Sequence, residues 1–230
     1  MSYLLSSVLT YGTAAAMLAA LNASRPGEAQ HPNQMPAALS ASDTAAIVDQ
    51  GPAVEAMAVV DFWHEAGPGR WFAKDSAFDR TFRDRFLSLH EAATRGELAD
   101  WLLTPEGALA LVLLLDQFPR NAFRDTPRMY DTDAQARAVA DAAIAVGHDR
   151  QVAIGLQFFF YLPFGHSEDI TDQERSVTLA RRLGEPTLPH AEHHRDIIRR
   201  FGRFPHRNPI LGRPMRPEEQ QFLDEGGFAG

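Results

Sequence analysis

The chain has 230 residues, of which 45% are hydrophobic and 23% charged, and its formal net charge is −8. This composition is typical of a globular protein, and a single domain of this length can bury roughly 70% of the surface of its unfolded chain. The sequence has no cysteine, which excludes disulfides, thiolate metal sites and cysteine nucleophiles. Lys74 is the only lysine among 22 basic residues, which argues against a polybasic membrane patch and Schiff-base chemistry.

The first 43 residues differ in composition from the rest. Residues 4–21 carry no charge, as in the apolar part of an export signal. However, export signals usually have a lysine or arginine before this part, and this sequence has none. Residues 22–43 are polar, contain proline and have no periodicity. We therefore predict a flexible extension and linker over residues 1–43 and a single α-helical domain over residues 44–230. We expect a cytoplasmic protein with no membrane span in the folded domain; export through residues 1–29 is the alternative.

Prolines, glycines and capping residues divide the domain into helices. The spacing of Phe78, Phe82 and Phe86 predicts an amphipathic helix. Thr104 is a capping residue before a helix that is apolar all round and therefore central in the core. Thr171 and Glu174 have the spacing of a capping box. No segment alternates with period two, so we predict an all-α fold, with helices over residues 52–66, 78–95, 105–118, 133–146, 171–183, 189–201 and 217–223.

Polar residues surround a proline at the end of the apolar core helix. Pro119 lacks a backbone N–H and disfavours the α conformation of the preceding residue, so we predict that the helix ends there. The candidate ligand-binding residues around this predicted exposed terminus are Asp116, Gln117, Arg120 and Asn121. The alternative is structural: the arginine complements the carbonyl end of the helix and the asparagine satisfies loop backbone.

Two histidine-containing segments follow. His166, Glu168 and Asp169 come after the breaks at Pro163 and Gly165. An imidazole beside carboxylates suits general acid–base catalysis, whereas acids at a helix start are also explained by the helix dipole. His190 and His194 share a helical face but lack the zinc-protease pattern, so we expect no metal site.

The strongest charge feature lies near the C-terminus. Residues 190–216 hold seven arginines and two acidic residues, a balance of +5, so the remainder of the chain sums to −13. This asymmetry indicates an electropositive site for phosphate or carboxylate. The candidate ligand-binding residues here are His194, Arg203, Arg207 and Arg213, and His206 is a candidate catalytic residue. Alternatively, these arginines pair internally with Asp116, Glu168 or Asp169.

Several segments in order resemble one bacterial family, domain of unknown function 924, over about residues 58–224. They are DFW (61–63), RWFAKD (70–75), FD (78–79), LLDQFPRN (114–121), YLPFGHSED (161–169), DQ (172–173), HRDII (194–198), RFGRFPHRN (200–208) and LGR (211–213). The resemblance implies a tetratricopeptide-like array of antiparallel helical hairpins, although the sequence shows no regular 34-residue repeat. It implies no reaction.

Three functions are compatible with these features. The first is a binding module whose arginines hold a carboxylate, a phosphate or an acidic protein partner. The second is an enzyme that acts on a small anionic substrate, with His166 or His206 as the acid–base group and Glu168 orienting it. The third is RNA binding through arginines interleaved with Phe201 and Phe204, which the net charge opposes. We favour the first, and we expect no cofactor and no DNA partner.

Overall fold

A computed structural model describes residues 51–230. The chain divides into two units, Met1–Glu55 and Ala56–Gly230. Of the first unit, only residues 51–55 are described, and they belong to helix α2. The predicted extension, the export alternative and the predicted domain start at residue 44 lie outside the described residues. All features of the candidate site belong to the second unit.

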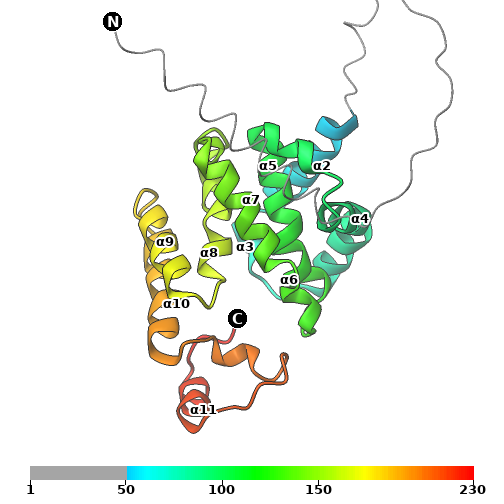
Figure 1. Cartoon of the computed structure of the whole chain (residues 1–230). Helices are drawn as coiled ribbons and strands as arrows, with labels where there is room; N and C mark the ends of the chain where they lie inside the picture. Colours follow the sequence, from blue (N-terminus) through cyan, green and yellow to red (C-terminus); the bar gives the residue numbers. More distant parts are fainter. Residues whose placement is uncertain (1–50) are drawn as a thin grey trace, which may run out of the picture. The chain divides into compact units, whose positions relative to one another are not determined.

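The secondary structure of residues 51–230 is helical and includes no β-strand, which confirms the all-α class (Figure 1). None of the helices among these residues has the length and apolar character needed to cross a membrane. The tetratricopeptide-like arrangement and the cytoplasmic location stay predictions. The α-helices are α2 (Gly51–Ala66), α3 (Pro68–Trp71), α4 (Ser76–Thr94), α5 (Pro105–Val112), α6 (Phe118–Ala122), α7 (Asp133–Ala145), α8 (Leu162–Gly165), α9 (Ile170–Ala180), α10 (Thr187–Phe201) and α11 (Pro217–Asp224).

Helix α4 forms as its sequence predicts. The Asp75 side chain accepts hydrogen bonds from the backbone N–H groups of Ala77 and Phe78 and so caps the helix. The predicted stripe of Phe78, Phe82 and Phe86 is buried, and the Phe82 ring packs against the Phe118 ring at a centroid distance of 5.1 Å. This stripe therefore joins α4 to α6, the helix that carries part of the candidate site.

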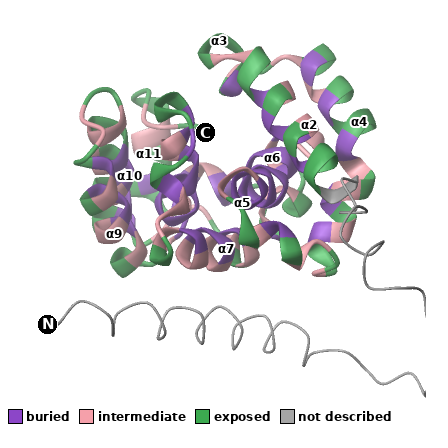
Figure 2. Cartoon of the chain, turned by 90° about the horizontal axis from the view of Figure 1, so that it is seen from above, coloured by how far each residue is buried: buried purple, intermediate pink, exposed green. Residues whose placement is uncertain are grey.

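Helix α5 lies at the centre of the core. Thr104 caps it by accepting a hydrogen bond from the Gly107 N–H at 3.1 Å, as predicted. Its residues from Gly107 to Val112 are all buried, and Figure 2 shows α5 in the buried colour. A Cβ on Gly107 would lie 2.2 Å from the Trp101 carbonyl oxygen, so the close approach of the preceding turn requires glycine here.

The core helix does not end before Pro119, contrary to the prediction. A π-helical turn, Leu113–Gln117, connects α5 to α6, and the Phe118 N–H donates to the Leu113 carbonyl, five residues back. Pro119 has no N–H to donate to this turn, and two carbonyl oxygens of the turn contact side chains: that of Leu114 lies 2.9 Å from His90 Nδ1, and that of Leu115 accepts the Thr132 hydroxyl at 2.6 Å. Asp116 and Gln117 consequently lie in the core, with 0% and 3% of their surface exposed.

Helix α9 begins one residue before the predicted capping box. The cap is Asp169, whose carboxylate accepts the Thr171 N–H at 2.7 Å, so the assignment of the cap to Thr171 was wrong. Gln173, on the first turns of α9, is fully buried and donates through Nε2 to the carbonyl oxygens of Gly165 and Ser167 at 2.7 and 2.6 Å. The two bonds fix the loop that carries His166 against α9.

Candidate anion-binding site

A buried carboxylate lies at the centre of the candidate site. The His166 imidazole contacts Asp116 Oδ1 through Nδ1 at 2.8 Å, and Gln117 Nε2 donates to Asp116 Oδ2 at 2.7 Å. The Arg120 guanidinium lies 3.2 Å from the same carboxylate and donates to the Asp116 backbone carbonyl at 2.8 Å. The π-helical turn therefore places Asp116 where residues from α6 and the end of α8 both reach it.

These contacts fix the protonation states of the pair. Burial raises the pKa of Asp116, but the charge of Arg120 and the contact with His166 outweigh it and lower the pKa to about 2. Burial and the Arg120 charge lower the pKa of His166 below its usual value, although Asp116 opposes them. An ionised Asp116 only accepts hydrogen bonds, so Nδ1 of a neutral His166 carries the proton and Nε2 has a free lone pair.

Arg120 and Arg207 flank a second carboxylate. Arg120 Nη1 donates to Asp133 Oδ1 at 2.8 Å, and Arg207 Nη1 lies 3.9 Å from Asp133 Oδ2. Arg207 also donates to the His166 backbone carbonyl at 2.9 Å. Its guanidinium lies 4.6 Å from the centre of the Tyr130 ring and 4.5 Å from that of Phe204. We call Asp116, Arg120, Asp133, His166 and Arg207 the central cluster.

Buried polar atoms in and beside the central cluster have no hydrogen-bond partner. In Arg120 the atom is Nη2, and in Arg207 it is Nε. His194 Nε2 and His206 Nδ1 are also buried without a hydrogen-bond partner. Burying an unpaired donor of a charged group costs at least about 1–3 kcal/mol. All four atoms come from predicted site residues, although unpaired buried atoms also occur elsewhere among the described residues, at Trp63, His148, Asp149 and Gln173.

The remaining predicted arginines bind carboxylates of the chain. Arg213 donates from Nη1 and Nη2 to the two oxygens of Glu168, at 2.6 and 3.0 Å, and Glu168 also accepts the Phe204 N–H at 2.8 Å. Arg203 binds the fully buried Glu219 through two hydrogen bonds of 2.7 and 2.8 Å. The Arg213–Glu168 pair matches the structural alternative considered for the arginine-rich segment, whereas Arg203 binds an acid that this alternative did not include.

The structure brings together some of the predicted residues and separates others. Asp116 contacts His166 Nδ1, whereas Glu168 is bound to Arg213. Asn121 lies apart from the cluster, since its amide donates to Asp79 at 2.8 Å. Residues in or near the cluster are Asp116, Gln117, Arg120, His166, His194, His206 and Arg207, and residues in the ion pairs around it are Glu168, Arg203 and Arg213.

His194 and His206 both contact the Phe204 ring, at centroid distances of 5.4 and 5.6 Å. Burial, and then the charge of Arg207, lower the pKa of His206 to about 3. Burial also holds the pKa of His194 well below its usual value. The His194 Nδ1 faces the Gly165 carbonyl oxygen at 3.2 Å, which only accepts, so Nδ1 carries the proton. Both imidazoles are consequently neutral at pH 7.

Sequence reasoning missed three contributors. The sequence identifies Asp133 only as the first residue of a helix, a position where an acid is already explained by the helix dipole. Tyr130 lies in a short turn without any motif, and Glu219 has an ordinary place in the first turn of α11. A signal for Glu219 exists in its spacing from Arg216, because an acid at the third helical position can bind the N-cap backbone, as it does at 2.9 Å.

Two other features of residues 51–230 bear on ligands. No group of three or more His, Asp or Glu side chains among them is arranged to hold a metal ion.

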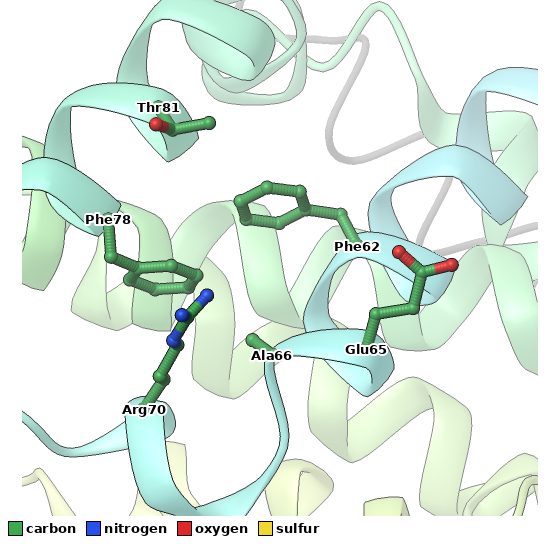
Figure 3. A pocket seen from close by; sticks show the side chains of 6 residues that line it. All are labelled: Phe62, Glu65, Ala66, Arg70, Phe78 and Thr81. Atoms are coloured by element: carbon green, nitrogen blue, oxygen red, sulfur yellow. The ribbon is translucent and has the colours of Figure 1, made fainter.

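A cleft of about 280 Å³ lies between α2, α3 and α4. Figure 3 shows the rings of Phe62 and Phe78 and the Arg70 guanidinium around it. None of its lining residues belongs to the central cluster.

Comparison with known proteins identifies the family. Residues 59–227 match the model of the family described as bacterial protein of unknown function (DUF924). The chain is 58% identical to a solved protein of unknown function, ATU0120 from Agrobacterium tumefaciens, over 76% of this chain and 99% of that chain, with a TM-score of 0.74. No curated protein matches the chain. The match over most of the chain confirms the resemblance noted in the sequence, and the protein belongs to the DUF924 family.

Proposed function

We propose that this protein is a binding module for a small molecule that bears a carboxylate or phosphate group, held between Arg120 and Arg207. The observation that carries the proposal is the pair of buried guanidinium nitrogens without partners, Arg120 Nη2 and Arg207 Nε. A planar guanidinium with an open N–H edge matches the oxygens of a carboxylate or phosphate. The oxygens of a bound anion would supply the acceptors that these donors lack.

Charge balance indicates how such a ligand would be held. Asp116 and Asp133 already neutralise the two arginines, so the cluster offers directed donors rather than a net positive charge. Asp133 and the aromatic rings of Tyr130 and Phe204 hold the guanidinium groups in place before the ligand arrives. Preorganised donors lose little side-chain entropy on binding. We therefore expect selectivity for the shape of the anion more than for its charge.

The test is calorimetric titration with inorganic phosphate, sulfate, acetate and malonate at constant ionic strength. We expect saturable binding of at least one of these anions at a single site. Arg207→Lys keeps the charge but removes the Nε donor, and it should weaken that binding at least tenfold, or about 1.4 kcal/mol. Arg199→Lys, at an exposed arginine of α10, is the matched control and should bind as the wild type does. Absence of saturable binding, or equal affinity in Arg207→Lys, contradicts the proposal.

One observation favours a second candidate function, acid–base catalysis on the bound anion. Asp116 orients the neutral His166 so that Nε2 has a free lone pair, the state required of a general base. We would monitor proton release from anionic carboxylic esters and the release of inorganic phosphate from phosphate monoesters. Activity that disappears in His166→Gln while the anion still binds would support catalysis. An equal rate in His166→Gln would exclude His166 as the base.

A further inference from the structure

The last five residues, Gly226–Gly230, fold back onto the side of the site that the histidines form. We call them the C-terminal strap. Figure 1 shows this red end of the chain turning back from α11 toward α10. The Phe228 ring lies 4.7 Å from the His194 ring and 5.1 Å from the His206 ring, measured between centroids. A Cβ placed on Gly230 would be 3.1 Å from His206 Cδ2, so the chain end itself contacts that imidazole.

The reversal of the chain is built into the end of α11. The Gly227 N–H donates to the Phe222 carbonyl at 2.9 Å, and the Gly226 N–H donates to the Leu223 carbonyl at 3.1 Å. Gly226 has a φ of 84°, which completes a Schellman motif. A Cβ on Gly227 would lie 2.5 Å from the Phe222 oxygen, so no other residue fits there without disturbing the turn. The two glycines therefore direct Phe228 onto the histidines.

The imidazoles that contact the strap have polar atoms without a hydrogen-bond partner. Both His194 Nε2 and His206 Nδ1 are buried and unpaired. The Phe204 ring connects them to the central cluster, because the Arg207 guanidinium lies 4.5 Å from its centre and the Phe228 ring lies 6.3 Å from it. The apolar ring of Phe228 packs against both imidazoles but cannot satisfy these nitrogens, so the closed strap leaves them unpaired, which favours its displacement.

Few interactions hold the strap closed. Within the described part of the chain, Phe228, Ala229 and Gly230 make no hydrogen bond and no ion pair. Phe228 is half-buried, and the two residues after it are exposed. The hydrogen bonds of Gly226 and Gly227 anchor the base of the strap to α11, whereas Phe228–Gly230 are held by packing against the imidazoles. These last three residues can therefore lift without breaking a polar contact.

We propose that the C-terminal strap is a lid on the anion site, and that lifting it makes His194 and His206 available to hydroxyl or other donor groups of the ligand whose anionic group Arg120 and Arg207 hold. This inference rests on the proposed binding function for the identity of the ligand. The movement of the strap rests on the contacts of Phe228 alone. The two parts can therefore be tested separately.

The movement is tested through the reactivity of the histidines of the full chain toward diethyl pyrocarbonate, mapped by peptide mass spectrometry. Neutral imidazoles react with this reagent when they are accessible, and His64, exposed on α2, serves as the internal reference. We expect slow modification of His194 and His206 in the wild type. Phe228→Ala should raise both rates at least tenfold relative to His64. Phe72→Ala, which removes an exposed ring elsewhere, is the matched control and should leave them unchanged.

A second variant keeps the test decisive if Phe228→Ala does not fold. Gly227→Ala disturbs the turn while retaining Phe228, and it should give the same increase. Unchanged rates at His194 and His206 in folded variants would overturn the lid.

The chemical class of the ligand is tested by repeating the modification experiment with saturating inorganic phosphate. We expect it to slow the modification of both histidines in Phe228→Ala at least tenfold. Accelerated modification without any phosphate, sulfate or carboxylate binding would confirm the movement but overturn the anion as the ligand. Anion binding with unchanged histidine rates would retain the binding function and reject the lid.

Discussion

At the scale of single residues, Asp116 is the side chain on which the site depends. Asp116→Asn keeps the size of the side chain but removes the charge that Arg120 and His166 contact. Breaking a buried pair by removing one partner typically costs about 3–5 kcal/mol, because the other charge is left uncompensated. Because Asp133 still binds Arg120 in this variant, we expect the free energy of unfolding to fall by about 3 kcal/mol, the lower end of this range. Urea denaturation measures the change.

The control for this substitution is Asp84→Asn, at an exposed position of α4. Surface substitutions of this kind change stability by less than about 0.5 kcal/mol. Equal stability losses in the two variants would mean that the Asp116 carboxylate contributes nothing specific to the fold.

The buried histidines predict a dependence of stability on pH. Burial lowers the pKa of His206 to about 3, whereas an unfolded histidine titrates near 6.5. Between these values the unfolded chain binds a proton that the folded chain does not, so the free energy of unfolding falls as the pH falls. One such group contributes a slope of up to about 1.4 kcal/mol per pH unit.

We expect His206→Phe to reduce the slope between pH 6.5 and 5, a range above the titration of the carboxylates. Denaturation curves at several pH values measure it, and His64→Phe, on the exposed face of α2, is the control. A slope in His206→Phe that matches the wild type would show that His206 is protonated in the folded protein.

At the scale of elements, the π-helical turn decides where the site residues lie. The Leu115 carbonyl, in this turn, accepts a hydrogen bond from the Thr132 hydroxyl. Thr132→Val has nearly the same shape and leaves this buried oxygen unpaired, which should cost about 1–3 kcal/mol. Thr178→Val is the control, because its hydroxyl donates to a carbonyl on an exposed helical surface. A thermal melt that shows the same loss for both would contradict a special role of the π-helical turn.

Sequence reasoning succeeded for elements whose signals are local. The Thr104 cap and the Phe78, Phe82 and Phe86 stripe depend on neighbours within one helix, and both are confirmed. The end predicted at Pro119 failed because side chains distant in sequence, His90 and Thr132, bind the carbonyl oxygens of the turn before the proline. Local sequence does not reveal such a partner. The same reason explains why Asp133 was missed as the partner of Arg120.

The charge of the arginine-rich segment could be predicted from the sequence, but the partner of each arginine could not. Its charge of +5 is visible in the sequence, yet only the fold shows that Arg203 binds Glu219 and Arg213 binds Glu168. These partners lie 16 and 45 residues away. Arg207 differs from both, because its Nε stays unpaired. The candidate site is therefore smaller than the cluster of charge in the sequence.

At the scale of the whole molecule, the pairing of arginines with carboxylates of the chain determines whether the protein can bind RNA. The net charge is −8, and Glu168 and Glu219 neutralise arginines that would otherwise contact phosphates. Nonspecific affinity for nucleic acid comes from such contacts and from the release of counterions. We expect no binding of a single-stranded RNA oligonucleotide at physiological salt, measured by fluorescence anisotropy. Tight binding that weakens steeply between 50 and 200 mM salt would show that the arginine pairs open, and it would favour RNA over a small anion as the ligand.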